Sequence, residues 1–271
     1  MTSQRDKAER FLEQHHGRGP LLIPNPWDVG SAKLLVSLGF TALATTSSGF
    51  AATLGRPDGS VTRDEALGHA AAIAAATSVP VSGDFEDGFA REPAGVAETV
   101  RLAIGAGLAG CSVEDYTRNS DDPVYDRGFA AERIAAAAAA NAGQGRLVLT
   151  ARAENYLYGR QDLADTIARL QAYEAAGADV LYAPGLTRLD DIRELVGSVG
   201  RPVNVLALRG GPTVAELAEA GVSRISVGGS FAFAALGAAV EAATELRDQG
   251  TYGYLEHART GAAAARAAFS G

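Results

Sequence analysis

The feature that most constrains the fold of this chain is the alternation of short apolar runs with longer alanine-rich amphipathic stretches. Most of the short runs are apolar throughout, which is typical of parallel strands covered on both faces. Eight runs have the composition of strands: 21–25, 42–47, 79–84, 110–115, 146–152, 180–183, 202–206 and 224–228. The sequence therefore predicts repeated βα units, and eight such units close naturally into a (β/α)₈ barrel.

Local signals mark where the intervening helices begin and end. Thr62 with Glu65, and Thr213 with Glu216, have the spacing of a capping box at a helix N-terminus. Glycines close helices just before the next candidate strand at Gly39, Gly107, Gly177 and Gly221. An open, doubly wound sheet is the alternative architecture. The barrel is favoured because no G-x-G-x-x-G motif follows the first strand.

Length and composition fit one domain spanning 1–271. Single α/β barrels have about 250 residues, close to the 271 here. The last stretch, 231–271, has the pattern of two or three helices without a strand. We expect those helices to cover the barrel or to reach a neighbouring subunit.

Charge and cysteine content exclude several classes of function. The net charge is −8 and no basic run occurs, so nucleic acid and anionic membranes are poor partner candidates. The single cysteine, Cys111, excludes an intramolecular disulfide and a cysteine-based zinc site. The N-terminus lacks the apolar core of a signal peptide, and no apolar run approaches the ~20 residues of a membrane span. We expect a cytoplasmic protein in which Cys111 faces the helices.

Most candidate strands end on a polar or charged residue. In a parallel barrel these ends meet on one face, which is where barrel active sites are built. The residues are Ser47, Ser48, Asp84, Glu114, Arg152 and Asn204.

The segment DFEDG suggests a metal site. Asp84, Glu86 and Asp87 follow an apolar strand, Gly88 permits a tight turn, and Glu114 ends the next strand. Crowded carboxylates repel one another unless an ion neutralises them. Oxygen ligands without nearby histidine or cysteine indicate Mg²⁺ or Mn²⁺. The alternative is that these are helix caps and surface charges, above all at Asp87.

Arg152 and the Ser47–Ser48–Gly49 turn are candidates for binding an anion. An arginine among carboxylates suits a bidentate contact with a substrate carboxylate. The alternative role for Arg152 is a structural salt bridge to Glu154 or Glu114. The four histidines lie in expected helices or near the termini, so no general-base histidine is evident.

Motifs at successive strand ends resemble the isocitrate lyase/phosphoenolpyruvate mutase superfamily. They run in family order over about 20–230 and are NPWDVGSA, TSSGFAATLGRPD, DFEDG, SVEDY, TARAEN and PVNVLA. The resemblance implies a (β/α)₈ barrel whose eighth helix is exchanged between subunits, in a dimer or a dimer of dimers. It also implies chemistry through an enolate of a small 2-keto acid.

The resemblance further implies roles for individual residues. It implies Mg²⁺ held by Asp84, Glu86 and Glu114, partly through water, with Asp58 facing the metal region. It implies that the Ser48–Gly49–Phe50 turn and Arg152 hold the substrate's carboxylate. Mg²⁺ and the turn amides would stabilise the developing negative charge.

The loop after the fourth strand departs from the family patterns. It has the sequence DYTRNSDDPVYD and lacks the K-[KR]-C-G-H motif of the lyases. Pro184 stands where methylisocitrate-type lyases have glutamate, and Thr46 stands where the mutase has tryptophan. The stretch Arg118–Asn119–Ser120 resembles the K-x-N-S motif of the mutase branch only loosely.

Three functions remain open at this point. The first is a Mg²⁺-dependent carbon–carbon lyase or decarboxylase for a small 2-keto or 2-hydroxy dicarboxylic acid. Its acid–base group would be Tyr116, Asn119 or a metal-bound water, alongside Arg152 and Glu114. The second is P–C chemistry on phosphonopyruvate. The third is a barrel that binds 2-keto acids without catalysis.

Overall fold

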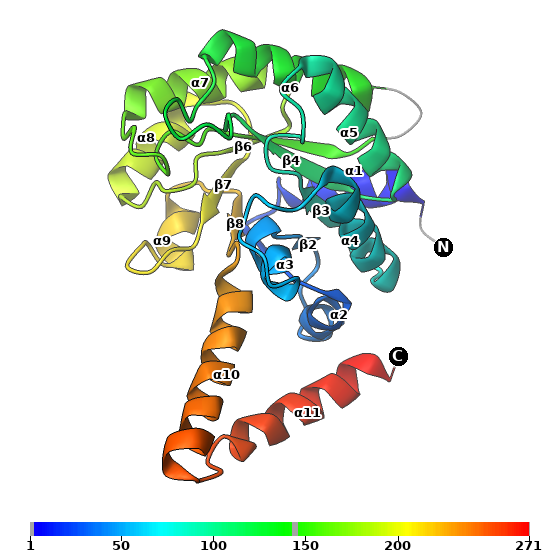
Figure 1. The fold of residues 1–271 in the computed structure, drawn as a ribbon. Helices are drawn as coiled ribbons and strands as arrows, with labels where there is room; N and C mark the ends of the chain where they lie inside the picture. The colour runs from blue at the N-terminus through cyan, green and yellow to red at the C-terminus, as the bar shows by residue number, and fades with distance from the viewer. Residues whose placement is uncertain (1–2, 143–145, 271) are drawn as a thin grey trace.

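Eight parallel strands form a nearly closed barrel (Figure 1) in a computed structural model that describes residues 3–142 and 146–270. The strands are β1 (Leu21–Ile23), β2 (Leu43–Ala44), β3 (Val81–Asp84), β4 (Gly110–Glu114), β5 (Val148–Arg152), β6 (Val180–Tyr182), β7 (Val203–Leu206) and β8 (Arg224–Ser226). The ladder runs from β1 through β8 and back down to β2. At the seam the Ala44 amide donates to the Pro24 carbonyl at 3.2 Å. All eight predicted strands and the barrel are confirmed, and the open-sheet alternative is wrong.

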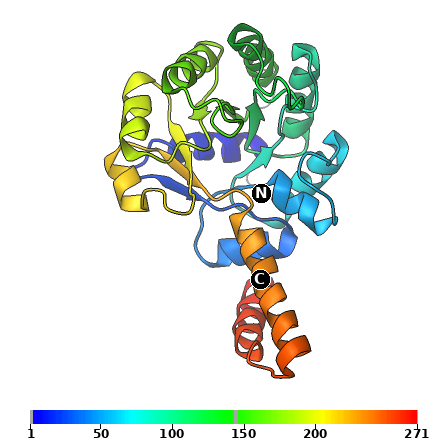
Figure 2. The ribbon, with the colours of Figure 1, turned by 60° about the vertical axis from the view of Figure 1, so that its left-hand side comes forward.

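Helices follow the strands in the order expected of βα units, and α2 to α9 lie around the barrel (Figure 2). They are α1 (Gln4–Gln14), α2 (Val29–Ser37), α3 (Ser47–Thr53), α4 (Arg63–Ala76), α5 (Pro93–Gly105), α6 (Arg127–Asn141), α7 (Leu163–Ala175), α8 (Leu189–Ser198), α9 (Val214–Glu219), α10 (Ser230–Gln249) and α11 (Leu255–Phe269). Both predicted capping boxes are present, at the starts of α4 and α9. The four glycines predicted to end helices all have positive φ, between 82° and 103°.

The alternation of strand side chains separates two environments. Cys111 and Val113 are fully buried in the same apolar cluster as Val100 and Ala103 of α5. Cys111 therefore packs toward the helices as predicted, and burial raises the pKa of its thiol to about 12. The alternate positions point into the barrel, where the upper layers are polar.

Helix α1 closes the N-terminal end of the barrel. Ala8 and Phe11 of this helix are fully buried in a second apolar cluster, together with strand residues including Val148 and Val180. Packing is close, since a Cβ added at Gly110 would lie 2.7 Å from the Phe11 ring. The lower end of the barrel is thus a packed apolar layer, as in other α/β barrels.

His15 caps α1 at the C-terminal end and lies buried beneath the barrel. Its Nδ1 lies 2.7 Å from the Phe11 carbonyl oxygen, which can only accept, so Nδ1 carries the proton. Its Nε2 is therefore an acceptor, and it lies 3.4 Å from Nη1 of Arg224. Burial, and then the charge of Arg224, lower the pKa of His15 to about 3.

The helices α10 and α11 project from the barrel as an arm (Figures 1 and 2). Ala232 is the one residue of this arm that is buried in the described part of the chain. The arm returns beside α2, where Phe269 lies next to Gly30. Large apolar side chains are exposed along it: Phe231, Phe233, Leu236, Val240, Leu246, Tyr252, Leu255 and Phe269.

Across 3–142 and 146–270, no helix combines the length and the apolar character needed to cross a membrane.

His15 should make folding stability depend on pH. Its pKa is lower in the folded state than the 6.5 of the unfolded chain, so the unfolded chain binds the extra proton. The stabilisation is complete above pH 6.5 and is lost as the pH falls toward 3. Between pH 7.5 and 5 this loss should amount to about 2 kcal/mol. Urea unfolding of wild type and His15→Gln should give a smaller decrease in the variant, and equal decreases would contradict the assignment.

Candidate active site

The polar strand ends line a cavity of about 190 Å³ at the C-terminal face of the barrel. Six residues that the sequence singled out lie on its wall: Ser47, Ser48, Asp58, Asp84, Arg152 and Asn204. The wall also includes residues from β1, β6 and β8, so strands from all around the barrel contribute to it. Five of the six strand-end residues that the sequence singled out are therefore on this wall, whereas Glu114 is not and instead contacts Arg152.

Arg152 lies between three carboxylates. Its Nη1 is 3.1 Å from Asp84, its Nη2 is 3.1 Å from Glu114, and its Nε is 2.9 Å from Glu154. The structure therefore includes the salt bridges weighed as the alternative role for Arg152. A guanidinium has five N–H groups, so two donors remain for another anion.

Burial disfavours the charged form of three glutamates at the site. The pKa of Glu114 is raised well above its usual range, first by burial and then by neighbouring carboxylates, against the effect of Arg152. The pKa of Glu154 is raised for the same first reason. Burial also raises the pKa of Glu86 to about 7. The local environment thus favours either protonation or an additional positive charge.

The DFEDG loop after β3 has strained backbone. Glu86 and Phe89 have φ values of 46° and 56°, which are unfavourable for residues with a side chain, and Gly88 has φ 77°. The Glu86 carbonyl accepts from the Glu114 amide at 2.9 Å, which ties this loop to the end of β4. Glu86 is not on the wall of the main cavity, and it lines a small separate pocket together with Asp84 and His69.

Arg118 neutralises part of this loop from the β4–α6 connection. Its Nη2 donates to Glu86 Oε2 and to Asp87 Oδ1, both at 2.8 Å. Asp87 is 4% exposed, so the alternative interpretation of Asp87 as a surface charge or helix cap is wrong. The sequence does not indicate this ion pair because Arg118 lies 31 residues from Asp87.

An unpartnered carboxylate oxygen and an excess of carboxylates favour binding of a hard cation. Glu86 Oε1 is buried and has no hydrogen-bond partner, and Asp84 is within the cavity wall. Five carboxylates around two arginines, Arg152 and Arg118, leave an excess of negative charge. Within the described ranges, however, no three carboxylates are close enough to coordinate one ion together. The donor set fits Mg²⁺ bound through few direct carboxylate contacts.

The Ser47–Ser48–Gly49 segment starts α3 and is not an isolated turn. The Ser47 amide donates to Asp84 Oδ2 at 3.0 Å, and the Gly49 amide donates to Thr46 Oγ1 at 3.3 Å. In the described chain the Ser48 amide has no such partner, so it is the one of the three amides left for a ligand. Phe50 stacks on His69 with the ring centroids 3.9 Å apart, and it lies outside the main cavity wall.

The loop candidates Tyr116 and Asn119 are not on the cavity wall. Tyr116 stacks on Tyr158 at 4.4 Å between centroids, and burial raises the pKa of the Tyr158 hydroxyl. Asn119 is exposed, and its Oδ1 accepts from the Asp121 amide at 3.1 Å. The structure thus brings together the strand-end residues but not these two loop residues.

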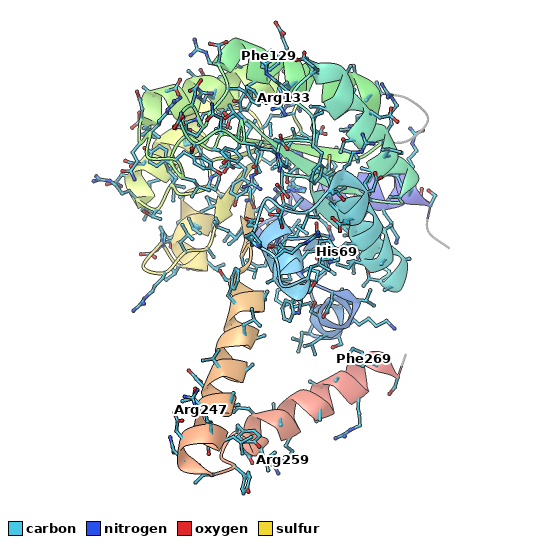
Figure 3. All side chains as sticks on the ribbon, in the orientation of Figure 1. His69, Phe129, Arg133, Arg247, Arg259 and Phe269 are labelled. Atoms are coloured by element: carbon cyan, nitrogen blue, oxygen red, sulfur yellow. The ribbon has the colours of Figure 1, made fainter. Side chains whose placement is uncertain are left out.

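Two buried polar residues that the sequence did not single out position the site. Arg133 of α6 donates to the carbonyls of Glu114, Asp87, Ala90 and Arg91 (Figure 3). Asn25 accepts from the amides of Val227 and Gly228 at 2.9 Å and donates to the Thr45 carbonyl, which joins β1, β2 and β8. Their partners are backbone groups, so the sequence does not indicate these contacts, although Asn25 begins the NPWDVGSA motif.

A family model described as phosphoenolpyruvate phosphomutase matches residues 11–247. The chain belongs to the isocitrate lyase/phosphoenolpyruvate mutase superfamily. This confirms the resemblance drawn from the strand-end motifs, and the superfamily contains lyases, hydrolases and mutases.

Curated relatives include two bacterial proteins. An uncharacterized protein of Mycobacterium tuberculosis is 37% identical over 88% of this chain and 89% of its own length. The 2-methylisocitrate lyase of Escherichia coli is 31% identical over 68% of this chain and 64% of its own length.

Solved structures share the fold over nearly the whole chain. A putative lyase/mutase from Burkholderia cenocepacia is 53% identical, with a TM-score of 0.91 over 93% of this chain and 92% of that one. Oxaloacetate acetylhydrolase bound to oxalate is 26% identical, with a TM-score of 0.84 over 93% and 90%. Phosphonopyruvate hydrolase bound to oxalate and Mg²⁺ is 25% identical, with a TM-score of 0.81 over 90% and 88%.

Replacing Arg133 should destabilise the fold through the loops that carry the carboxylates. Arg133→Met leaves buried carbonyls without donors, and we expect a decrease of about 3 kcal/mol in the free energy of unfolding. The exposed Arg127→Met on the same helix is the matched control and should change stability little. Urea unfolding of both variants measures the difference. If the two variants were equally stable, Arg133 would have no anchoring role.

Proposed function

We propose that this protein is a Mg²⁺-dependent lyase or decarboxylase that cleaves a C–C bond of a small 2-keto or 2-hydroxy dicarboxylic acid through an enolate. The observation that supports it best is the buried group of three carboxylates around Arg152. Relatives that are named for 2-methylisocitrate and oxaloacetate cleavage support the same class. An Mg²⁺ ion in a structurally similar hydrolase supports the metal.

Each residue has a role in this proposal. Asp84, Glu86 and Glu114, with Asp58 nearby, would hold Mg²⁺, and Mn²⁺ is the other cation with matching preferences. When bound there, Mg²⁺ would supply Lewis acidity for a developing negative charge.

The remaining residues bind and orient the acid. Arg152 would use its two remaining N–H donors for a substrate carboxylate, together with the Ser48 amide. Asn204 on β7 also lines the cavity and would orient the substrate. Tyr116 and Asn119 belong to the loop after β4, so a proton-transfer role for either would require the loop to close over the cavity.

Phosphonopyruvate chemistry is the second candidate, supported by the mutase and phosphonopyruvate hydrolase among the similar structures. The contacts of Arg118 favour the first proposal instead, because this guanidinium is already paired with Glu86 and Asp87. The third candidate, a barrel that binds 2-keto acids without catalysis, is tested by the same measurements.

Turnover should require both Mg²⁺ and Asp84. NMR should detect consumption of oxaloacetate or a substituted malate with Mg²⁺ and not with EDTA. Asp84→Asn should reduce the rate more than about 100-fold, because the uncharged amide weakens binding of the cation. Asp121→Asn, on the exposed loop, is the control and should keep wild-type activity.

Other outcomes would select another function. Turnover that is unchanged by EDTA would exclude the metal mechanism. Consumption of phosphonopyruvate alone would favour P–C chemistry. Metal-dependent binding of these acids without turnover of any of them would favour a barrel that binds 2-keto acids without catalysis.

The arm supports a second proposal, that α10 and α11 pack on another copy of this chain in a dimer or dimer of dimers. Phe233, Leu236 and Val240 are between 50% and 65% exposed on one helix, which is unusual for side chains of this size. Burial against a neighbouring barrel would remove this apolar surface from water.

Disrupting the arm should reduce the oligomer. The double variant Leu236→Asp/Val240→Asp places two charges in the expected interface, and light scattering after size-exclusion chromatography should give a smaller mass than wild type. Val214→Asp introduces the same type of change at an exposed position of α9 and should leave the mass unchanged. A monomeric wild type would contradict the proposal.

A further inference from the structure

A buried arginine without an acidic partner lies in the same cavity. Arg224 of β8 is 5% exposed and lines the cavity together with Asn204 and Ser226. Within the described residues it forms no salt bridge, whereas the half-buried Arg152 and the buried Arg169 each contact at least two carboxylates. The buried Arg133 also lacks a carboxylate partner there, but it donates to four backbone carbonyls.

All partners of Arg224 are neutral. Its Nε donates to Asn204 Oδ1 at 2.8 Å, and its Nη1 donates to Thr150 Oγ1 at 3.1 Å. The same Nη1 lies 3.4 Å from His15 Nε2, which is an acceptor because Nδ1 carries the proton. In the described part of the chain, Nη2 of Arg224 has no hydrogen-bond partner. The guanidinium is thus held in one orientation with one amino group left for a ligand.

Arg224 keeps its charge in this environment. Burial is the main cause that lowers its pKa, to about 10, so the group is protonated at neutral pH. A buried charge without a counter-charge is unfavourable unless other groups compensate it. Four carbonyls accept from Arg133. In the described chain the acceptors around Arg224 are only the side chains of Asn204, Thr150 and His15. An anionic ligand in the cavity would supply the missing charge, and the rigid guanidinium would bind it with little loss of entropy.

Arg224 lies at a different depth in the cavity from the Arg152 group. Asp84, Arg152 and the Ser48 amide lie where β2, β3 and β5 end, whereas Arg224 starts β8 and reaches toward His15 under the barrel. The cavity therefore has two groups of donors for anions, one at the rim and one deeper between Thr150 and Asn204.

We propose that Arg224 is a specificity-determining residue that binds the second carboxylate of the substrate, while the first is bound at the rim by Arg152 and the Ser48 amide. This inference rests on the proposed function for the identity of the rim ligand. It adds that monocarboxylic acids are poor ligands because they leave Arg224 unpaired.

Binding of two matched acids tests this role. Malate and 2-hydroxybutyrate have four carbons and a 2-hydroxy acid group, but only malate has the second carboxylate. Calorimetry with Mg²⁺ should show that wild type binds malate at least 10-fold more tightly. Arg224→Met should weaken malate binding about 10- to 100-fold and leave 2-hydroxybutyrate within about 3-fold. Arg224→Lys, which keeps the charge but not the planar group, should be intermediate.

The same titrations identify the results that would overturn the inference. It is wrong if Arg224→Met weakens both acids equally, changes neither, or if wild type does not distinguish them. It is also wrong if 3-phosphonolactate binds more tightly than malate in an Arg224-dependent manner, since the second group would then be a phosphonate. Arg247→Met, an exposed arginine of the arm, is the control for the substitution.

Two further measurements distinguish failure of the proposed role of Arg224 from failure of the proposed C–C chemistry. Repeating the titrations with chelator removes any metal contribution at the rim, which affects both acids alike, so the preference for malate should persist even if the proposed C–C chemistry fails. Thermal unfolding with and without malate should show a ligand-induced increase in Tm that Arg224→Met loses, while the ligand-free Tm changes little. A large fall in the ligand-free Tm of both Arg224 variants would indicate a structural role and contradict the inference.

Discussion

The contact between Arg152 and three carboxylates is the interaction on which the rest of the active-site face depends. Asp84, Glu114 and Glu154 come from the ends of neighbouring strands, and without a central cation their repulsion in a buried site would separate those ends. The parallel register places Glu114 directly beside Arg152, so the ion pair follows from strand pairing. Burial still raises the pKa values of Glu114 and Glu154. A divalent cation would favour the charged forms of both carboxylates.

The surrounding structure is organised to keep these groups in place. Arg133 binds the carbonyls of the segments that carry Asp87 and Glu114, and Arg118 pairs with the side chains of the same segment. Asn25 bridges the seam between β1 and β2 through the Thr45 carbonyl, and it also binds the amides that follow β8. These contacts come from α6, the β4–α6 loop and the segment after β1, so side chains both on and outside the cavity wall hold the geometry of the site. Preorganisation of this kind is what electrostatic catalysis requires.

Sequence reasoning recovered the parts of this structure that depend on local patterns. Apolar runs, capping boxes and helix-ending glycines are short-range signals, and they gave all eight strands and the barrel. The strand-end rule then identified Asp84, Arg152 and Asn204 as cavity residues. Asp87 was misjudged and Arg133 and Arg224 were overlooked because their partners are distant in sequence, or are carbonyls and neutral side chains that have no signature. The loop residue Asn119 shows the converse limit, since a motif resemblance indicates a role without indicating where the side chain points.

The two arginines of the cavity differ in the net charge of their surroundings, and so in the ligand charge that each favours. Arg152 is already overcompensated by carboxylates, so an acid bound there adds negative charge and is favoured only when a cation is also present. Arg224 has the opposite imbalance, because its neighbours are neutral and its charge is uncompensated among the described residues. A ligand with a metal-chelating group at one end and an anionic group at the other satisfies both imbalances at once. Charge balance across the cavity, rather than its shape, is therefore the physical basis on which this barrel would select a dicarboxylic acid.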